Sequence, residues 1–530
     1  MEKSLFCSQY QLVDLLSDNC KILNKQRMRC FEINSRNLVS RVYISATITC
    51  MANLSTFGIS NEISQAENKL SSENDRLNFI FILVDDLGWT DLGCYGSDLH
   101  ETPNIDRLAG ENMKFTDAYS AAPLCSPTRA ALMTGKHPAR LNMTTWFENS
   151  GTPHPNNHQK LISPTTIGNL PLDEYSIAKA FKDAGYFTAH IGKWHLGDAV
   201  HFPEAHGFDF NTGITVWGAP ISYWYPFKGW RSRNEYRFIA GLEDLTGDNE
   251  NSYLTDRLTD EAIKIIRHKK HEPFFLHMSY YTPHTPIEGK PDYVEYFKSK
   301  IKPGLYHSNA VYAAMIASLD ENVGRILREV EKAGISDRTV IIFYSDNGGS
   351  LAPNRYNNHP LKIGKGTLYE GGIRVPLIIK WPGVTKPGSI SDVPVTTMDF
   401  YPTLLEIANI TGNEEHNMDL DGISIVSVLK EPEKKMDRNT LFWHFPHYYF
   451  RPEGTAPQSA VRHGSWKLIH FFEDNRLELY NLDEDIGEKQ DLVNKNSNVA
   501  DELYKMLQTW RKEVRAKLPS FNPDYKPEFW

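Results

Sequence analysis

The sequence predicts an α/β fold with two parts: a large domain whose mostly parallel sheet is sandwiched by helices, and a smaller C-terminal α+β domain with an antiparallel sheet. Apolar runs of strand length alternate with amphipathic helical segments through the middle of the chain, which is typical of a sheet covered on both faces. Short strands then follow one another without helices between them. We place an N-terminal extension at 1–76, the large domain at 77–435 and the C-terminal domain at 436–530.

The elements of the large domain follow from their apolar patterns. Residues 78–84 are apolar on both faces, as in a central parallel strand. Residues 375–381 form a further candidate strand. Three pairs of a helix and a strand lie between them: 175–184 with 187–191, 258–267 with 273–279, and 315–330 with 339–344. This alternation predicts a doubly wound sheet.

The C-terminal domain is predicted from shorter patterns. Residues 461–469 and 478–482 have the character of short antiparallel strands with turns between them. A final helix is expected from an apolar stripe at helical spacing. The stripe consists of Leu503, Met506, Leu507, Trp510 and Val514.

The N-terminal extension differs from the rest of the chain. Met1 is not followed by a basic start and an apolar run, so no standard signal peptide begins there. Residues 42–55 form a weaker candidate for an export segment, with Met28 as an internal start. The alternative is an extension without function. We expect residues 65–75 to be a polar linker, and the protein to be periplasmic or secreted.

Charge and cysteine content limit the classes of function. The net charge of −9 argues against a general nucleic-acid binder, and no stretch reaches the ~18 apolar residues of a membrane-spanning helix. Of the six cysteines, only Cys94 and Cys125 lie beyond the first fifty residues. If Cys125 is catalytic, Cys94 has no disulfide partner in the folded body, which fits a bacterial enzyme better than a disulfide-stapled animal protein.

One stretch predicts a reactive cysteine at the start of a helix. Residues 125–136 read Cys-Ser-Pro-Thr-Arg-Ala-Ala-Leu-Met-Thr-Gly-Lys. Pro127 suits a first helical turn and Gly135 can end the helix. Cys125 would then lie at the positive end of the helix dipole, with Arg129 four residues on along the same face. The pattern favours an anion-handling site, and the alternative is a buried cysteine at an ordinary helix start.

Polar side chains follow two of the predicted strands directly. Asp85 and Asp86 come after the strand at 78–84, and Asp346 and Asn347 come shortly after the strand at 339–344. Ligands bind at the carboxyl ends of strands in open α/β sheets, so the four oxygen-bearing side chains can converge. Oxygen ligands select a hard cation, Ca²⁺ or Mg²⁺. The alternative is a pair of solvated turns.

Basic side chains complete the constellation. Lys193 and His195 alternate along an extended segment, so both can face one pocket. His284 lies in a proline-rich loop, Thr-Pro-His-Thr-Pro, whose rigidity suits a positioned catalytic group. Lys365 lies between two glycines. The alternatives are that Lys193 is a surface lysine, that His195 is a histidine at the edge of the core, and that His284 is an ordinary loop histidine.

The segment 125–136 resembles the type I sulfatase signature C-x-P-[S/T]-R-x-x-[L/M]-x-T-G-[R/K] at every fixed position. Residues 185–195 resemble the second signature of that family, which ends Gly-Lys-Trp-His, and residues 364–376 are also similar. The resemblance covers roughly residues 77–515 and is to bacterial arylsulfatases and carbohydrate sulfatases. It implies an alkaline-phosphatase-like large domain.

The resemblance also implies a role for each candidate residue. In sulfatases the cysteine at position 125 is converted to formylglycine, whose hydrate is the nucleophile. The metal ligands are that residue at 125 together with Asp85, Asp86, Asp346 and Asn347, and the ion is Ca²⁺. Of the other residues, Lys193 and Lys365 bind the sulfate, Arg129 neutralises its charge, His195 deprotonates the nucleophile and His284 protonates the leaving alcohol. Lys362, outside the Gly-Lys-Gly context, is the alternative second lysine.

The implied function is the removal of sulfate from a sulfated carbohydrate, of the galactose or N-acetylgalactosamine sulfate type. The implied partner is a formylglycine-generating enzyme or an anaerobic sulfatase-maturating enzyme. Aromatic residues at 443–449 and 217–225 could line a sugar subsite, the alternative being packing. Two other functions stay open: a phosphomonoester or phosphonate hydrolase of the same superfamily, and a non-catalytic glycan-binding homologue whose Cys125 is never converted.

Overall fold

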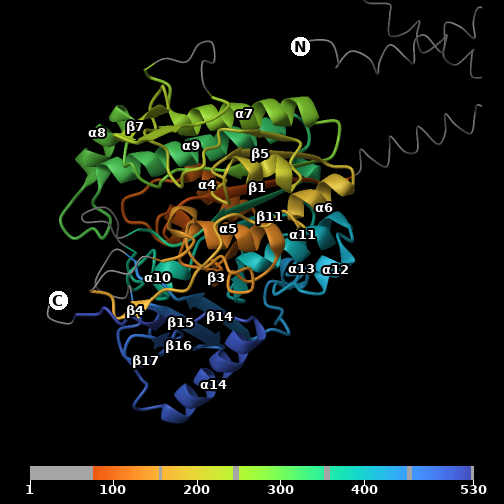
Figure 1. The fold of residues 1–530 in the computed structure, drawn as a ribbon. Helices are drawn as coiled ribbons and strands as arrows, with labels where there is room; N and C mark the ends of the chain where they lie inside the picture. Colours follow the sequence, from red (N-terminus) through yellow and green to blue (C-terminus); the bar gives the residue numbers. More distant parts are fainter. Residues whose placement is uncertain (1–75, 154–157, 243–249, 351–357, 450–455, 527–530) are drawn as a thin grey trace, which may run out of the picture. The chain divides into compact units, whose positions relative to one another are not determined.

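The computed structural model describes residues 76–153, 158–242, 250–350, 358–449 and 456–526. This part of the chain contains an eight-stranded sheet flanked by helices and a four-stranded antiparallel sheet near the C-terminus (Figure 1). The predicted fold class is therefore confirmed. The export segment, the internal start and the linker lie outside the described residues, and the boundary at residue 435 stays a prediction. Among the described helices, none is long and apolar enough to cross a membrane.

The large sheet is centred on β1 (Asn78–Val84), in the strand order β12-β2-β11-β10-β1-β9-β5-β6. Strands β10, β1, β9, β5 and β6 run parallel to one another. The strand predicted at 375–381 is β11, and it runs antiparallel to both neighbours, so the sheet is mostly parallel. The other strands are β2 (Met113–Phe115), β5 (Phe187–Gly192), β6 (Phe210–Thr212), β9 (Phe274–Ser279), β10 (Thr339–Ser345), β11 (Leu377–Lys380) and β12 (Ser389–Ser391).

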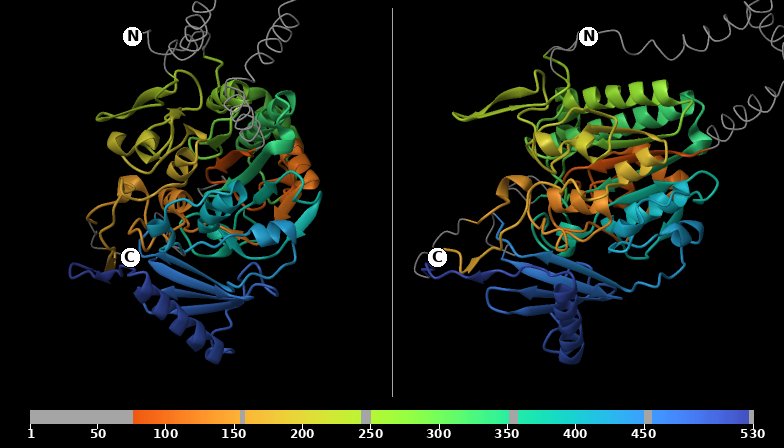
Figure 2. Two further views of the ribbon diagram at one scale, coloured as in Figure 1. Left: turned by 90° about the vertical axis from the view of Figure 1, so that its right-hand side faces the viewer. Right: turned by 45° about the vertical axis from the view of Figure 1, so that its right-hand side comes forward.

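Alternate side chains of β1 enter two separate cores. Phe79, Phe81 and Leu83 pack on one face of the sheet, whereas Ile80 and Ile82 pack on the other. Burying a side chain of this size contributes roughly 1.5–3 kcal/mol. Figure 2 shows the helical layers on the two sides of the sheet. The first face is covered by α5 (Cys125–Thr134), α6 (Ile177–Asp183), α11 (Phe400–Ala408) and α13 (Val426–Lys430), and the second by α4 (Pro103–Glu111), α7 (Leu254–Lys269) and α9 (Ala310–Lys332).

The three predicted helix–strand pairs are present as α6 with β5, α7 with β9, and α9 with β10. Helix α9 begins earlier than the apolar pattern indicated. Its start is set by Asn309, whose side-chain oxygen accepts hydrogen bonds from the backbone N–H groups of Val311 and Tyr312, each at 3.0 Å. The periodicity did not predict α4, α11, α13 or α8 (Pro291–Lys300), because short helices leave little pattern to detect.

The C-terminal sheet pairs β14, β15, β16 and β17 in sequence order, all antiparallel. The stretch predicted at 461–469 contains a hairpin, with a turn at Gly464 where φ is 58°. The final helix, α14 (Ser497–Glu513), buries Leu503, Leu507 and Trp510 as expected. The strands are β14 (Thr440–Phe445), β15 (Gln458–His463), β16 (Trp466–Phe471) and β17 (Leu477–Asn481).

Smaller elements lie outside these two sheets. Strand pairs β3 with β13, β4 with β18, and β7 with β8 form two-stranded ribbons. Leu124, just before α5, belongs to the same apolar cluster as Trp443 of the C-terminal sheet. The start of α5 is therefore held between the two sheets. The bounds are β3 (Ala118–Tyr119), β4 (Leu161–Ile162), β7 (Lys228–Ser232), β8 (Glu235–Phe238), β13 (Val395–Thr396), β18 (Ser520–Phe521), α10 (Glu370–Ile373) and α12 (Glu414–Asn417).

Candidate active site

Cys125 is the first residue of α5, and its side chain is buried. The helix ends at Gly135, whose φ of 69° gives the left-handed cap that the sequence predicted. The sulfur lies 3.5 Å from Asp85 Oδ1 and 3.4 Å from Lys365 Nζ. Burial raises the pKa of the Cys125 thiol to about 12, although Lys193 and Lys365 act in the opposite direction. An unmodified thiol at this position is therefore protonated and poorly nucleophilic at neutral pH.

The two strand-end pairs converge as the sequence predicted. Strands β1 and β10 are neighbours in register, with Val84 opposite Ser345, so the residues that follow them meet. The backbone N–H of Asp86 donates to Asp346 Oδ1 at 3.2 Å, and Asn347 Nδ2 donates to Asp86 Oδ1 at 2.7 Å. All of these side chains are buried. Asp86 also adopts a left-handed backbone, with φ of 62°, a strain that is typical of functional sites.

Three basic groups neutralise the carboxylates. Lys193 Nζ lies 2.7 Å from Asp85 Oδ2, Lys365 Nζ lies 2.5 Å from Asp86 Oδ1, and Arg129 contacts Asp346 Oδ2 at 2.8 Å. Burial raises the pKa of Asp85 to about 7, with Asp346 and Asp86 adding to the effect. Burial also opposes ionisation of Asp86, but Lys365 and His284 hold its pKa below the usual value. Burial has the same effect on Asp346, whose pKa is held below the usual value by Arg129 and Lys193.

The donor set fits a hard divalent cation. Asn347 Oδ1 is buried and has no hydrogen-bond partner, which leaves an oxygen lone pair inside the carboxylate cluster. Ligand atoms of Asp85, Asp86, Cys125 and His284 lie within 4.8 Å of one another. Oxygens from three carboxylates and one amide are the donors that Ca²⁺ prefers in proteins. A cation here would compete with Lys193 and Lys365 for their carboxylate partners.

Arg129 lies beneath the site rather than in the pocket. Its guanidinium donates to Asp346 Oδ2 through Nε and Nη2, and to the Lys193 carbonyl and Ser279 Oγ through Nη1. These contacts engage all three guanidinium nitrogens, and only 2% of the side chain is exposed. Arg129 therefore joins the C-terminal ends of β5, β9 and β10 under the carboxylates and lies outside the cavity lining. Its role in neutralising the charge of the sulfate stays a prediction.

His195 is held by a carboxylate that sequence reasoning missed. Its Nε2 lies 2.7 Å from Glu148 Oε2, and the other oxygen of Glu148 accepts from the backbone N–H of Gly218 at 2.8 Å. Nδ1 of His195 is buried and has no partner. With the proton held on Nε2 by Glu148, Nδ1 carries a lone pair. Glu148 lies in a short 3₁₀ turn, Phe147–Asn149, and no motif marks it in the sequence.

The position of Gly218 against His195 explains the absence of a side chain there. A Cβ at Gly218 would lie 2.5 Å from Cε1 of the His195 ring.

Burial lowers the pKa of His195, although Glu148 acts in the opposite direction. The ring is therefore neutral at neutral pH and can accept a proton.

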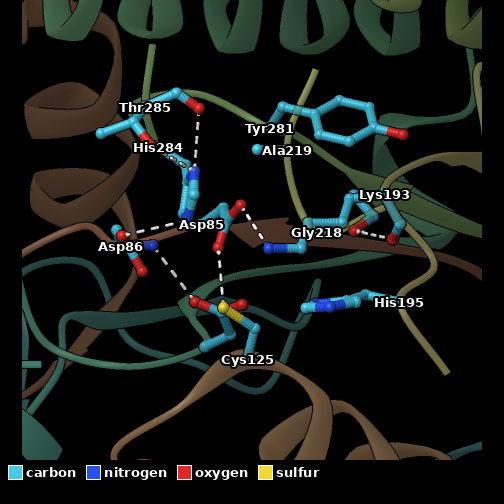
Figure 3. Close-up of polar contacts among 12 residues, drawn as sticks. Asp85, Asp86, Cys125, Lys193, His195, Gly218, Ala219, Tyr281, His284 and Thr285 are labelled. Carbon is cyan, nitrogen blue, oxygen red and sulfur yellow. Dashed lines mark hydrogen bonds and ion pairs between the residues drawn. The ribbon is translucent and has the colours of Figure 1, made fainter. Parts of the chain in front are cut away.

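His284 faces the carboxylates from the loop after β9. Its Nε2 is 3.6 Å from Asp86 Oδ2, and its Nδ1 is 2.9 Å from the Thr285 carbonyl oxygen. Burial lowers the pKa of His284 to about 3, and the Lys365 charge adds to the effect. Figure 3 shows Cys125 and Asp85 in the centre of the site, with Asp86 and His284 on the left and His195 on the right.

A cavity of about 250 Å³ opens above Cys125. The ten residues predicted from the sequence all gather here, in two layers. Asp86, Cys125, His195, His284 and Lys365 line the cavity, while Asp85, Arg129, Lys193, Asp346 and Asn347 lie below it. Trp146, Glu148, Arg231, Arg237 and Tyr449 form part of its outer wall.

The positions of the side chains distinguish between the alternatives for the aromatic stretch at 443–449 and for the second lysine. Trp443 is buried and its Nε1 donates to the Ser120 carbonyl at 2.9 Å, so packing explains this aromatic residue. Tyr449, at the end of the same aromatic stretch, lines the cavity. Lys362 lies over the ring of Tyr369 and outside the cavity lining, so of these two lysines Lys365 is the one that lines the cavity.

The chain is similar to known proteins over most of its length. The family model described as sulfatase matches residues 77–410, and the model described as N-sulphoglucosamine sulphohydrolase, C-terminal, matches residues 362–516. A Formosa agariphila protein named sulfatase is 37% identical and the match covers 80% of this chain and 85% of that protein. Human steryl-sulfatase is 30% identical (77% and 78% covered), and human N-acetylgalactosamine-6-sulfatase is 31% identical (75% and 73%). The crystal structure of Ps i-CgsB in complex with k-i-k-neocarrahexaose superposes with a TM-score of 0.69 at 29% identity, covering 86% of this chain and 94% of that one.

Proposed function

Because the chain belongs to the sulfatase family and is a sulfuric ester hydrolase, we propose that it removes sulfate from a sulfated carbohydrate, with residue 125 as formylglycine and with Ca²⁺ as its cofactor. One observation carries the proposal. Cys125 lies at the floor of the cavity, at a helix N-terminus, between paired carboxylates and Lys365. Burial raises the pKa of its thiol to about 12, so the unmodified thiol is a weak nucleophile at neutral pH, which supports a modified residue at this position.

The modified residue and the cation would supply two kinds of chemistry. Formylglycine at position 125 would provide, as its hydrate, a hydroxyl nucleophile and a second hydroxyl for release of sulfate, and Ca²⁺ would provide positive charge beside the ester oxygens. The Ca²⁺ ligands would be Asp85, Asp86, Asp346 and Asn347, whose oxygens converge beside residue 125.

His195 is the base in this proposal. Its unpartnered Nδ1 can accept a proton from the attacking hydroxyl, because Glu148 holds the other proton on Nε2. Glu148 is a positioning residue, since it acts through the imidazole. The hydrogen bond from Gly218 to the second oxygen of Glu148 fixes the carboxylate and therefore the plane of the ring.

The leaving alcohol would meet His284, and the sulfuryl group would meet Lys365. Lys365 Nζ is beside both Cys125 and Asp86, where it can contact a sulfuryl oxygen and stabilise the charge that grows on it. His284 is neutral in the resting site, so it must first bind a proton before it can donate one to the leaving oxygen. The negative charge of a bound ester next to Nε2 favours that protonation.

The carbohydrate part of the proposal depends on the outer wall of the cavity and on relatives that are named for sugar substrates. Trp146 and Tyr449 form an edge-to-face pair with ring centroids 5.8 Å apart, which offers an aromatic surface to sugar C–H groups. Arg231 and Arg237, from the β7–β8 hairpin, add positive charge. We propose galactose or N-acetylgalactosamine sulfates as the substrate type.

Maturation and location are parts of the same proposal. Residue 125 would be converted by a formylglycine-generating enzyme or by an anaerobic sulfatase-maturating enzyme. A periplasmic or secreted location is supported by the export segment predicted at 42–55.

The proposal is tested with two matched esters. Protein co-expressed with a maturation enzyme should hydrolyse nitrophenyl sulfate with a kcat/KM far above that for nitrophenyl phosphate, and release sulfate from a sulfated galactoside. A preference for the phosphate ester would instead establish the phosphomonoesterase alternative. A Cys125 that stays unconverted beside the maturation enzyme, with no turnover of either ester, would favour the glycan-binding alternative.

A further inference from the structure

A second buried cluster of metal-ligand residue types lies outside the active site. Asp91 follows the loop that carries Asp85 and Asp86, His100 precedes α4, and His307 precedes α9. One ligand atom from each residue falls within 4.8 Å of the others, and the three residues are 1%, 4% and 5% exposed. Neither the sequence motifs nor the active-site chemistry accounts for this cluster.

The spacing is too long for hydrogen bonds and suits a shared ion. Asp91 Oδ1 lies 3.6 Å from His100 Nδ1 and 3.6 Å from His307 Nε2. An N–H···O hydrogen bond brings the two heavy atoms to about 2.7–3.2 Å. In tetrahedral zinc sites, bonds of about 2.0–2.2 Å place the ligand atoms about 3.3–3.6 Å from one another.

The hydrogen bond at the far side of His307 orients its ring toward the cluster. Nδ1 lies 2.7 Å from Asp98 Oδ1. Burial opposes ionisation of Asp98, but the backbone hydrogen bonds from Tyr306 and His307, together with the His307 ring, hold its pKa below the usual value. Asp98 is therefore a carboxylate and the Nδ1–H donates to it. A histidine that gives one ring N–H to a carboxylate and turns its other nitrogen to a metal is the usual arrangement of zinc sites.

The other nitrogen of His307 is left without a partner. Nε2 is buried and accepts no hydrogen bond. With the proton on Nδ1, a lone pair on Nε2 faces a carboxylate oxygen of Asp91, and the two repel each other in a buried place. A cation between them removes this repulsion.

Asp91 has one oxygen available for such a cation. Oδ2 accepts hydrogen bonds from the Gly88 N–H at 2.7 Å and from the Tyr312 hydroxyl at 2.5 Å. Oδ1 faces the two imidazoles.

Burial lowers the pKa of His100 to about 4, so its ring is neutral and can act as a ligand. Its Nδ1 is also 3.0 Å from the Asp91 carbonyl, and a metal would take the place of the proton on that nitrogen.

We propose that Asp91, His100 and His307 bind a structural zinc ion, with a water molecule or the Asp91 carbonyl as the fourth ligand. Two imidazoles and one carboxylate favour zinc over calcium. The ion would fasten the loop after β1 to the start of α9, and Asp91 also binds the backbone of Gly88, two residues from Asp86. Zinc at this position would therefore stabilise the loop that carries the active-site carboxylates.

The test is metal analysis of the full chain, purified without an affinity tag or chelator. Plasma mass spectrometry should find about one zinc ion per chain. His307→Gln and His100→Gln should each lose that zinc, whereas His416→Gln, at a buried histidine elsewhere, should keep it. Asp346→Ala, in the active-site carboxylate cluster, should also keep zinc, which separates this site from the catalytic one.

Reconstitution makes the result independent of how each variant folds. Stripped wild-type protein should regain zinc and show a higher Tm on adding it, and cobalt in its place should give the visible absorption of a tetrahedral site. Wild-type protein that takes up no zinc would overturn the proposal. So would zinc content that survives in His307→Gln and His100→Gln.

Discussion

Replacing Glu148 by glutamine tests whether the carboxylate sets the tautomer of His195. Nε2 of His195 and the Gly218 N–H both donate to Glu148, at 2.7 and 2.8 Å. A glutamine has one acceptor oxygen for these two donors, and its NH₂ group can donate to the imidazole instead. The proton would then move to Nδ1 and remove the lone pair that serves as the base.

The magnitude follows from the hydrogen bond that is lost. A hydrogen bond to a charged group is worth about 1.5–3 kcal/mol, and each 1.36 kcal/mol is tenfold in rate. We therefore expect Glu148→Gln to lower kcat about 10- to 150-fold, with a smaller change in KM. Glu148 also raises the pKa of His195 against burial. Its removal should shift the acidic limb of the kcat/KM profile to lower pH, because a base with a lower pKa stays neutral to lower pH.

The assay is steady-state hydrolysis of nitrophenyl sulfate from pH 4 to 9, in the range where the folded variant is stable. Asp198→Asn is the matched control, because Asp198 pairs with His201 at 2.8 Å outside the cavity lining. The control should keep the wild-type kcat and pH profile. Wild-type kcat and an unmoved acidic limb in Glu148→Gln would refute the assignment of His195 as a base oriented by Glu148.

Three further predictions concern the nucleophile, the sulfate contact and the domain interface. Cys125→Ala should abolish turnover and leave the circular dichroism spectrum unchanged; residual hydrolysis would count against Cys125. Lys365→Ala should lower kcat/KM about 10- to 100-fold through loss of a charged contact, while Lys362→Ala, outside the cavity, should stay near wild type. Lys467 of β16 lies 2.7 Å from Glu370 and both are fully buried. Lys467→Met should cost about 3–5 kcal/mol in the free energy of unfolding, measured by urea titration, and an unchanged midpoint would show that the pair is not stabilising. Burial opposes ionisation of Glu370, but Lys467 and Arg374 lower its pKa from 4.5 to about 2. The contribution of ionised Glu370 to the free energy of unfolding should therefore be present above pH 4.5 and lost as the pH falls toward 2.

The sequence was informative where local patterns and the geometry of a parallel sheet decide where a strand, a helix or a site residue lies. A run apolar on both faces identifies β1, and parallel strands end at one edge, so Asp85 and Asp346 could be placed together before their distance was known. The helix at Cys125 followed from Pro127 and Gly135.

Features set by distant contacts could not be predicted in this way. Glu148 has no motif, and its pairing with His195 spans 47 residues. The orientation of Arg129 depends on acceptors at the C-terminal ends of β5, β9 and β10, which only the assembled sheet brings together. The Asp91–His307 contact joins residues that no signature connects.

Peptide mass spectrometry of residue 125, measured beside the specific activity of the same preparation, tests the central claim most directly. Conversion replaces the sulfur and two hydrogens of the Cys125 side chain by one oxygen, so the converted peptide is lighter. Across preparations with different extents of maturation, activity should rise in proportion to the converted fraction and extrapolate to zero with unmodified cysteine. Full activity in protein whose Cys125 is intact would contradict the account.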